Sequence, residues 1–153
     1  MTNQKTAKQH FTEEQIKKLR DHLKGHQLEA IIRLALVTGL RRDELLSLKW
    51  QDLDLDKGEV HFQNTKTTNR ESLPIPADVT EILKHHLAEQ LRANVVSSLF
   101  VFPDATGAPL TACQLIQGFH EILEQAELPC MSFHDVRMTV KKQAYISFKE
   151  AQG

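Results

Sequence analysis

Residues 38–54 read TGLRRDELLSLKWQDLD, and this stretch decides how the chain is expected to fold. Before it, apolar residues recur at helical spacing from about Gln27, which predicts a central helix that ends at Gly39. Within it, the leucines that follow Arg42 predict a third helix that runs to Trp50. Apolar and polar residues alternate after that helix, which indicates strands. The stretch therefore marks the change from helices to a small sheet.

The first helix is expected to begin after a flexible polar tail at residues 1–10. Thr12 and Gln15 have the spacing of a capping box, in which each side chain accepts a hydrogen bond from the backbone N–H of the other residue. Apolar residues then repeat at helical spacing until Gly25, a residue type that commonly ends helices. This pattern predicts a helix between Thr12 and Gly25.

Three short strands are expected after the third helix. Apolar residues alternate with polar ones at 53–55 and again at 60–62, and the Asp-Lys-Gly sequence at 56–58 predicts the turn between them. A second polar turn is expected at 64–69. Two prolines in the third strand, at 72–76, lack the N–H that a strand donates to its neighbour, so this strand must lie at an edge.

Helices return after the sheet. Asp78 is expected to cap one of them, and Thr111 and Gln114 form a second capping box before another. The last helix is expected to begin around His134. The whole pattern predicts an α+β fold that is mainly α-helical: a helical bundle with a small three-stranded antiparallel sheet inserted after the third helix, in one domain at residues 11–153.

The composition excludes several classes of protein. The chain has 153 residues, of which 41% are hydrophobic and 25% charged, as in ordinary soluble domains. No apolar run approaches the roughly 18–20 residues of a membrane span, so no membrane partner is expected. Residues 1–8 lack the apolar core of a signal peptide, and we therefore expect a cytoplasmic protein.

The two cysteines and the net charge also bear on function. Cys113 and Cys130 lack the CxxC spacing of a structural zinc site, and no metal is expected. Cys113 is interpreted as a small buried residue and Ser132 as a cap or turn residue. The formal net charge of −1 is not typical of a general nucleic-acid binder. A local basic surface can still bind DNA, because local charge matters more than the sum.

Four basic residues stand in settings that suit the binding of a phosphodiester: Arg41, Lys66, His134 and Arg137. An arginine between two helices can direct its planar guanidinium at two phosphate oxygens, near the backbone amides of the next helix. Lys66, in the polar turn between two strands, can reach a phosphate or give a proton to a leaving oxygen. His134 and Arg137 are three positions apart at a helix start and therefore share one face.

Each of these residues also has a purely structural interpretation. Arg41 can be a surface arginine balanced by Asp43 or Glu44, which would contribute little. Lys66 can be a solvated hairpin lysine, and His134 can cap or pack locally. Position alone leaves both interpretations open, and only the four residues together favour a phosphate site.

Several segments together resemble the catalytic domain of the tyrosine recombinase family, of the phage-integrase type. Residues 38–54 closely resemble the family's first arginine box, and residues 133–137 (FHDVR) resemble the start of its second. The resemblance covers about residues 11–137. The segments that resemble its β-hairpin lysine region and a later loop are 65–67, Arg70, 73–76 and 101–103 before Gly107.

The resemblance implies breakage and rejoining of DNA strands through a 3′-phosphotyrosine intermediate, without metal or cofactor, as in DNA integration by mobile elements. Arg41 and Arg137 would then clamp the scissile phosphate. Lys66 would be the general acid for the leaving 5′ hydroxyl, and His134 would assist proton transfer. Glu44 would orient Arg41 or steady the helix start. The residues expected to contact DNA are Arg41, Arg42, Lys66, Arg70, Arg137 and Lys141.

Two departures from the family pattern lie near the C-terminus. The attacking tyrosine of the family lies well beyond the second arginine, whereas Tyr145 follows Arg137 closely and is expected to pack on an apolar stripe. Met138 stands where the family often has a histidine. We therefore expect a catalytic-domain fragment, inactive alone, of a protein that assembles as a multimer on double-stranded DNA.

Two other functions remain open on the sequence. The first is a non-catalytic DNA-binding module, whose contact surface would be the basic clusters at 17–20, 41–42 and 141–142. The second is a protein-interaction module of the same fold, which the near-neutral charge permits. Salt-dependent DNA binding that needs Arg41 and Arg137 would separate the leading function from both.

Overall fold

Six α-helices, one short 3-10 helix and a small sheet make up the part of the chain that the structure describes. The computed structural model describes residues 10–63, 69–93 and 99–152, with side chains as far as residue 143. Among these residues, no helix is both long enough and apolar enough to cross a bilayer. In chain order the elements are α1 (Glu13–Leu23), α2 (Glu29–Thr38), α3 (Arg42–Leu46), η1 (Trp50–Asp52), β1 (Leu53–Asp54), β2 (Glu59–Gln63), β3 (Arg70–Pro74), α4 (Ala77–Arg92), α5 (Ala112–Gln125) and α6 (Phe133–Gln152).

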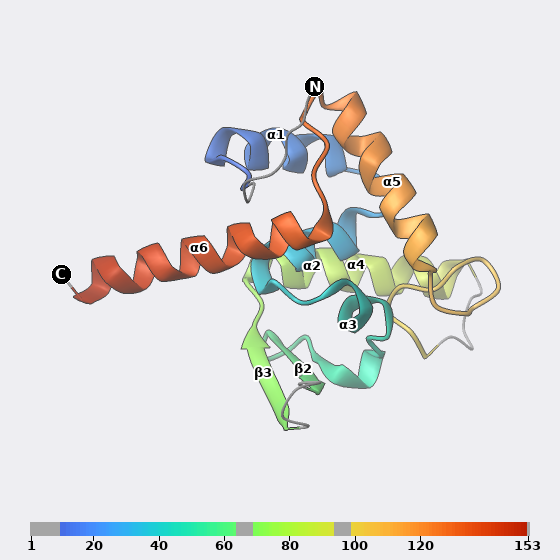
Figure 1. Cartoon of the computed structure of the whole chain (residues 1–153). Helices are drawn as coiled ribbons and strands as arrows, with labels where there is room; N and C mark the ends of the chain where they lie inside the picture. Colours follow the sequence, from blue (N-terminus) through green and yellow to red (C-terminus); the bar gives the residue numbers. More distant parts are fainter. Residues whose placement is uncertain (1–9, 64–68, 94–98, 153) are drawn as a thin grey trace.

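Helix α2 lies at the centre of the domain (Figure 1). It contacts α4 and α6, while α5 contacts both α1 and α3. The sheet lies at one end of the molecule, beyond α3, and the C-terminal end of α6 extends away from the other helices (Figure 1). This architecture confirms the predicted mainly α-helical α+β fold with an antiparallel sheet inserted after the third helix.

The sheet is antiparallel with the strand order β1-β2-β3. Val60 in the middle strand pairs with Leu53 on one side and Leu73 on the other, and it is fully buried. β3 lies at an edge, as its proline requires, and it begins and ends slightly earlier than predicted. The sheet therefore adds one buried face to the end of the helical core.

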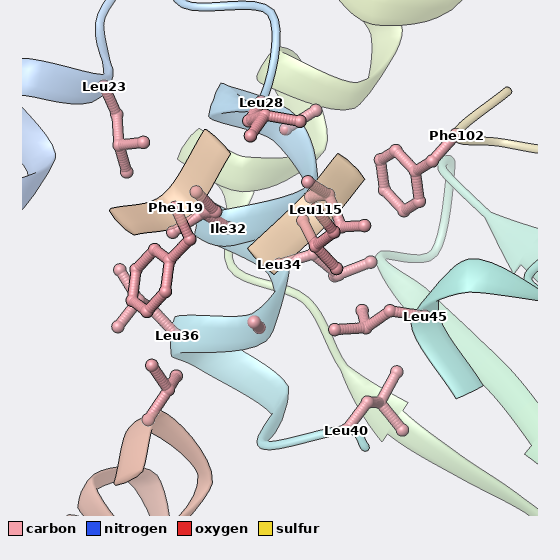
Figure 2. Packing of buried hydrophobic residues seen from close by; sticks show 14 of the residues in the cluster. Leu23, Leu28, Ile32, Leu34, Leu36, Leu40, Leu45, Phe102, Leu115 and Phe119 are labelled. Atoms are coloured by element: carbon pink, nitrogen blue, oxygen red, sulfur yellow. The ribbon is translucent and has the colours of Figure 1, made fainter. Parts of the chain in front are cut away.

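The core forms around α2, which is buried on nearly every side. Leu115 and Phe119 of α5 pack on this helix, and Leu45 of α3 lies beside them (Figure 2). Burying a leucine or phenylalanine side chain contributes about 1.5–3 kcal/mol, so this cluster fixes where α3 and α5 lie. The buried residues of α2 are Ala30, Ile31, Ile32, Leu34, Ala35 and Leu36.

Both predicted capping boxes are confirmed. Thr12 N–H donates to Gln15 Oε1 at 2.9 Å, and Gln15 N–H donates to Thr12 Oγ1 at 3.1 Å. Thr111 and Gln114 repeat the same two bonds at 2.9 and 3.1 Å. These bonds satisfy backbone donors that have no partner inside the helix, and they set the starts of α1 and α5.

The third helix is shorter than predicted, because it ends at Leu46 rather than at Trp50. The chain beyond it pairs with a segment that is distant in sequence. Val101 N–H donates to Leu48 O at 3.0 Å, and Trp50 N–H donates to Leu99 O at 3.0 Å. These bonds require an extended backbone, and this tertiary pairing overrides the local helical pattern.

Two further predictions were wrong. Pro76, not Asp78, is the N-cap of α4. Asp78 lies in the first turn, where its carboxylate accepts the Val79 N–H at 2.9 Å and faces Arg33 Nη2 at 3.8 Å. A negative charge there still favours the helix, through the dipole. Cys113 is exposed rather than buried, because α5 buries a different face.

A buried polar cluster holds the chain after α4 against that helix. His86 Nε2 lies 2.6 Å from Val101 O, and Gln90 Nε2 donates to the same oxygen at 3.2 Å. Gln90 Oε1 also accepts the Trp50 Nε1–H at 2.8 Å. Burial lowers the pKa of His86 below its ordinary value; the hydrogen bond to Val101 opposes this effect, and the charge of His85 adds to it. The neutral ring of His86, with its proton on Nε2, is therefore the form that donates to Val101 O in the folded chain.

We predict that His86 makes the free energy of unfolding depend on pH. The ring of His86 is protonated near pH 6.5 in the unfolded chain and only at lower pH in the folded chain. The contribution of His86 to stability is therefore complete above about pH 6.5 and is lost as the pH falls through the folded pKa. His86→Phe keeps a ring and leaves Gln90 on Val101 O, so part of the pH dependence should disappear. Urea unfolding at about pH 7.5 and 5.5 measures this.

The exposed neighbour His85 supplies the control for that experiment. His85→Gln should keep most of the loss of stability at the lower pH, because burial is the largest cause of the lowered His86 pKa and the charge of His85 only adds to it. Equal losses in His86→Phe and in the unaltered chain would contradict the prediction.

Gly39 allows α6 to approach the end of α2. It adopts a left-handed backbone with φ of 69°, and its N–H donates to Ala35 O at 2.9 Å. A Cβ at this position would lie 3.2 Å from Val140 Cγ1 of α6. Because this separation is tighter than ordinary van der Waals contact, glycine is needed here for two independent reasons.

We predict that Gly39→Ala destabilises the fold more than Gly25→Ala does. The left-handed backbone alone costs about 1–2 kcal/mol for alanine at either position. Gly25 has φ of 77° with nothing within 4 Å of a Cβ, so it carries only that backbone cost. Gly39→Ala must also displace Val140. Urea unfolding of both variants measures the difference. Equal losses in the free energy of unfolding would show that Val140 of α6 does not restrict the side chain at position 39.

Candidate functional site

Arg41 lies between two helices, as predicted from its position after Gly39. It is the N-cap of α3, and its backbone N–H donates to Glu44 Oε1 at 2.7 Å. This bond satisfies a donor at the helix start and fixes the backbone from which the arginine side chain extends. Glu44 therefore acts on Arg41 through the backbone.

The start of α6 places His134 and Arg137. Asp135 N–H donates to Ser132 Oγ at 3.2 Å, and Ser132 N–H donates to Asp135 Oδ2 at 2.8 Å. This reciprocal pair confirms Ser132 as a cap residue and starts the helix at Phe133. His134 is exposed in the first turn, and Arg137 follows three positions later on the same side of the helix.

These residues meet in one pocket of about 510 Å³ between α3, α5 and α6, which we call the arginine pocket. Its apolar wall includes Ile116 and Phe119 of α5 together with Met138 of α6. The basic residues that line the pocket are Arg41, Arg42, His120, His134, Arg137 and Lys141.

Two guanidiniums lie close together in this pocket. Burial lowers the pKa of Arg137, the positive charge of Arg41 lowers it further, and the negative charge of Glu44 opposes both effects. Arginine nevertheless stays protonated at neutral pH, so the two charges repel. Within the described part of the chain, Arg137 Nε is buried without a hydrogen-bond partner. A bound anion would relieve both the repulsion and the unsatisfied donor.

The neighbouring carboxylates leave Arg41 without an ion pair among the described residues. Asp43 Oδ1 faces Arg42 Nε at 3.3 Å, and Glu44 accepts the Arg41 backbone N–H. The alternative in which Asp43 or Glu44 balances the Arg41 side chain is therefore not the arrangement in this structure.

Arg70 lies outside this pocket, and two other residues with predicted roles fall outside what the structure describes. Arg70 Nη2 pairs with Asp52 Oδ1 at 2.8 Å in a separate groove between α3 and the sheet. Lys66, the predicted general acid, lies outside the described residues. Tyr145 has its backbone in α6, and its side chain also lies outside them. No cluster of three metal-ligating side chains occurs among the residues that the structure describes.

Sequence reasoning missed the part of the pocket that α5 supplies. Ile116, Phe119 and His120 line it, and His120 also lies 3.8 Å from Cys130 Sγ at the edge of a second groove. The available signal was the spacing of residues 116, 119 and 120, which places them side by side on a helix. That spacing indicates a shared face but not what the face meets.

Comparison with known sequences identifies relatives over most of the chain. The sequence profile described as Phage integrase family matches residues 9–145. The tyrosine recombinase XerC-like protein of Caldanaerobacter subterraneus subsp. tengcongensis is 34% identical over 161 residues, covering 84% of this chain and 41% of the relative. The integrase of Salmonella phage P22 is 24% identical, covering 73% of this chain and 30% of that protein. The chain thus spans less than half the length of these relatives.

Solved structures share the fold. The crystal structure of XerA recombinase superposes with a TM-score of 0.80 at 17% identity, covering 90% of this chain and 50% of that one. The XerH site-specific recombinase bound to its difH substrate gives 0.76 at 21% identity, covering 90% and 43%. At such low identity, the likeness shows a common fold.

We predict that inorganic phosphate stabilises the chain through the arginine pocket. At a phosphate concentration ten times the dissociation constant, binding adds about 1.4 kcal/mol, which for a domain of this size raises Tm by about 3–6 °C. Arg41→Ala/Arg137→Ala should lose this increase, because the variant lacks both guanidiniums. Thermal unfolding in phosphate and in chloride of equal ionic strength measures it.

A control is needed because phosphate also stabilises folded proteins by exclusion from their surface. Lys84→Ala/Arg92→Ala removes two exposed positive charges from α4, where they pair with Glu81 and Glu89. This α4 control should keep the full phosphate response. An equal response in both double variants would show that exclusion alone is at work.

Proposed function

Because the chain belongs to the phage integrase family of tyrosine recombinases, we propose that its arginine pocket binds a backbone phosphate of double-stranded DNA during site-specific recombination. The observation that carries this proposal is that Arg41 and Arg137 line one pocket and that Arg137 Nε is buried there without a partner among the described residues. A planar guanidinium can form two parallel hydrogen bonds with the oxygens of a phosphate.

The pocket suits a reaction in which the charge on a phosphate grows. Attack on a phosphodiester passes through a five-coordinate arrangement with more negative charge on its oxygens than the starting ester has. Arg41 and Arg137 are already fixed by helix starts, so little reorganisation is needed when that charge develops. His134 is exposed and lines the same pocket, and we assign it to donate a hydrogen bond to the phosphate or to exchange a proton with it.

The family reaction also needs a general acid and a tyrosine nucleophile. We assign Lys66 as the general acid for the leaving 5′ hydroxyl on the family resemblance. Tyr145 is a poor candidate for the nucleophile in the same pocket, because it lies just over two helical turns beyond Arg137, about 12 Å along the axis of α6. The described residues therefore supply phosphate binding and charge stabilisation, and the 3′-phosphotyrosine step requires a tyrosine positioned elsewhere.

The structural relatives support DNA as the partner and a multimer as the working assembly. One is the Tn1549 transposon integrase in complex with circular intermediate DNA, with a TM-score of 0.77 at 19% identity. Another is a lambda integrase tetramer bound to a Holliday junction, with a TM-score of 0.66 at 18% identity. As part of this proposal, we extend both features to the present protein.

Duplex DNA binding tests the proposal. We expect fluorescence anisotropy of a labelled duplex to show affinity that falls steeply with salt, and a log–log slope that is smaller by about 1–2 in Arg41→Ala/Arg137→Ala, because each lost phosphate contact removes about 0.9 from the slope. The α4 control removes the same charge and should keep the slope. Circular dichroism and urea unfolding check that each variant is folded.

The outcome also separates the alternative functions. Binding that survives loss of both arginines but disappears in Lys17→Ala/Arg20→Ala would support a non-catalytic module that uses the basic face of α1. Absence of DNA binding in every chain would exclude both DNA functions for this domain.

A further inference from the structure

Thr139 makes an unusual pair of hydrogen bonds on α6. Its side chain is almost fully buried, with 2% of its surface exposed. The hydroxyl donates to Asp135 O, one turn back on the same helix, at 2.8 Å. The hydroxyl oxygen also accepts the backbone N–H of Phe11 at 2.9 Å. The first bond is common for a threonine inside a helix, whereas the second joins α6 to the opposite end of the sequence.

Phe11 is where the described chain enters the packed domain. Its side chain is buried, and α1 begins shortly after it. Since Phe11 N–H precedes the helix, it has no partner within α1, and burial without Thr139 would leave it unsatisfied at a cost of about 1–3 kcal/mol. The bond therefore fixes the entering backbone and α6 relative to each other.

Thr139 and Arg137 project from α6 in different directions. Two positions along a helix correspond to a rotation of about 200°, so one side chain faces the body of the domain while the other faces the arginine pocket. A second contact lies one position further along, where Val140 covers Gly39. These two contacts leave α6 little freedom to rotate about its own axis.

We propose that Thr139 is a positioning residue: by binding the Phe11 N–H it fixes the rotation of α6 and so holds Arg137 beside Arg41. This inference rests on the proposed function of the arginine pocket. A rotation of α6 by roughly ten degrees would move the end of a long side chain by about 1 Å, and displacements of that size are costly in sites that depend on orientation. The Phe11 backbone is thereby coupled to the phosphate site without touching it.

A double-mutant cycle in DNA binding tests this coupling. Thr139→Val removes the hydroxyl and keeps the branched shape. We expect it to weaken duplex binding about three- to tenfold at low salt, which is less than the complete loss of a hydrogen bond to a charged group, because Arg137 is displaced and not removed. In the Arg137→Ala background the same change should have almost no further effect, because the group that it positions is absent. Thr139→Ser retains a hydroxyl and should restore binding.

Thr80 provides a matched control for general loss of stability. It is also a buried threonine, and its hydroxyl donates to Pro76 O at 3.1 Å within α4, away from the pocket. Thr80→Val should leave DNA affinity unchanged. If Thr139→Val is not folded at the temperature of the assay, Thr139→Ala repeats the cycle, since alanine favours the helix and also lacks the hydroxyl.

The possible results separate this inference from the proposed function. If Arg137→Ala binds DNA as well as the unaltered chain, the phosphate site is wrong and the positioning role falls with it. If Arg137→Ala weakens binding but Thr139→Val does not, only the positioning role is overturned. Equal losses from Thr139→Val in both backgrounds overturn it as well, because they would show an effect that does not pass through Arg137.

Discussion

Two positive charges, on Arg41 and Arg137, are held close enough to repel, and the rest of the site depends on how the fold imposes this contact. Arg41 is fixed because α2 is buried and ends in the left-handed Gly39. Arg137 is fixed because α6 starts at the Ser132 cap and packs on the same glycine. The hydrophobic burial that fixes these helices thus outweighs the repulsion between the two arginines. A bound anion would remove that repulsion and so stabilise the fold.

The carboxylates near the two arginines determine whether the site is available to a ligand. Glu44 and Asp135 each lie close enough in sequence to neutralise an arginine. Both instead accept backbone N–H groups at the starts of α3 and α6. The same residues that begin the helices therefore leave the guanidiniums free of ion pairs within the described chain, which a simple count of neighbouring charges would not reveal.

Most local signals in the sequence were reliable, although the predicted cap at Asp78 was wrong, and contacts between distant segments could not be predicted. The capping boxes at Thr12 and Thr111 were predictable because both partners lie within one turn. The early end of α3 was not, because it depends on pairing of Leu48 with Val101, far along the chain. Arg41 and Arg137 were identified by residue type and family resemblance. Periodicity alone could not have shown that they meet, and it gave no indication that α5 forms the pocket wall.

A chain with a formal net charge of −1 can still present a strongly basic site. Charges more than about 8 Å apart are largely screened at physiological salt, so an approaching phosphate responds to the groups within that distance and not to the total. Among the described residues, the lining of the arginine pocket holds several basic groups and no carboxylate. Asp43 pairs with Arg42, and Glu44 accepts a backbone N–H. A near-neutral sum is therefore compatible with the proposed phosphate site, because it limits non-specific attraction to DNA without removing the local positive charge.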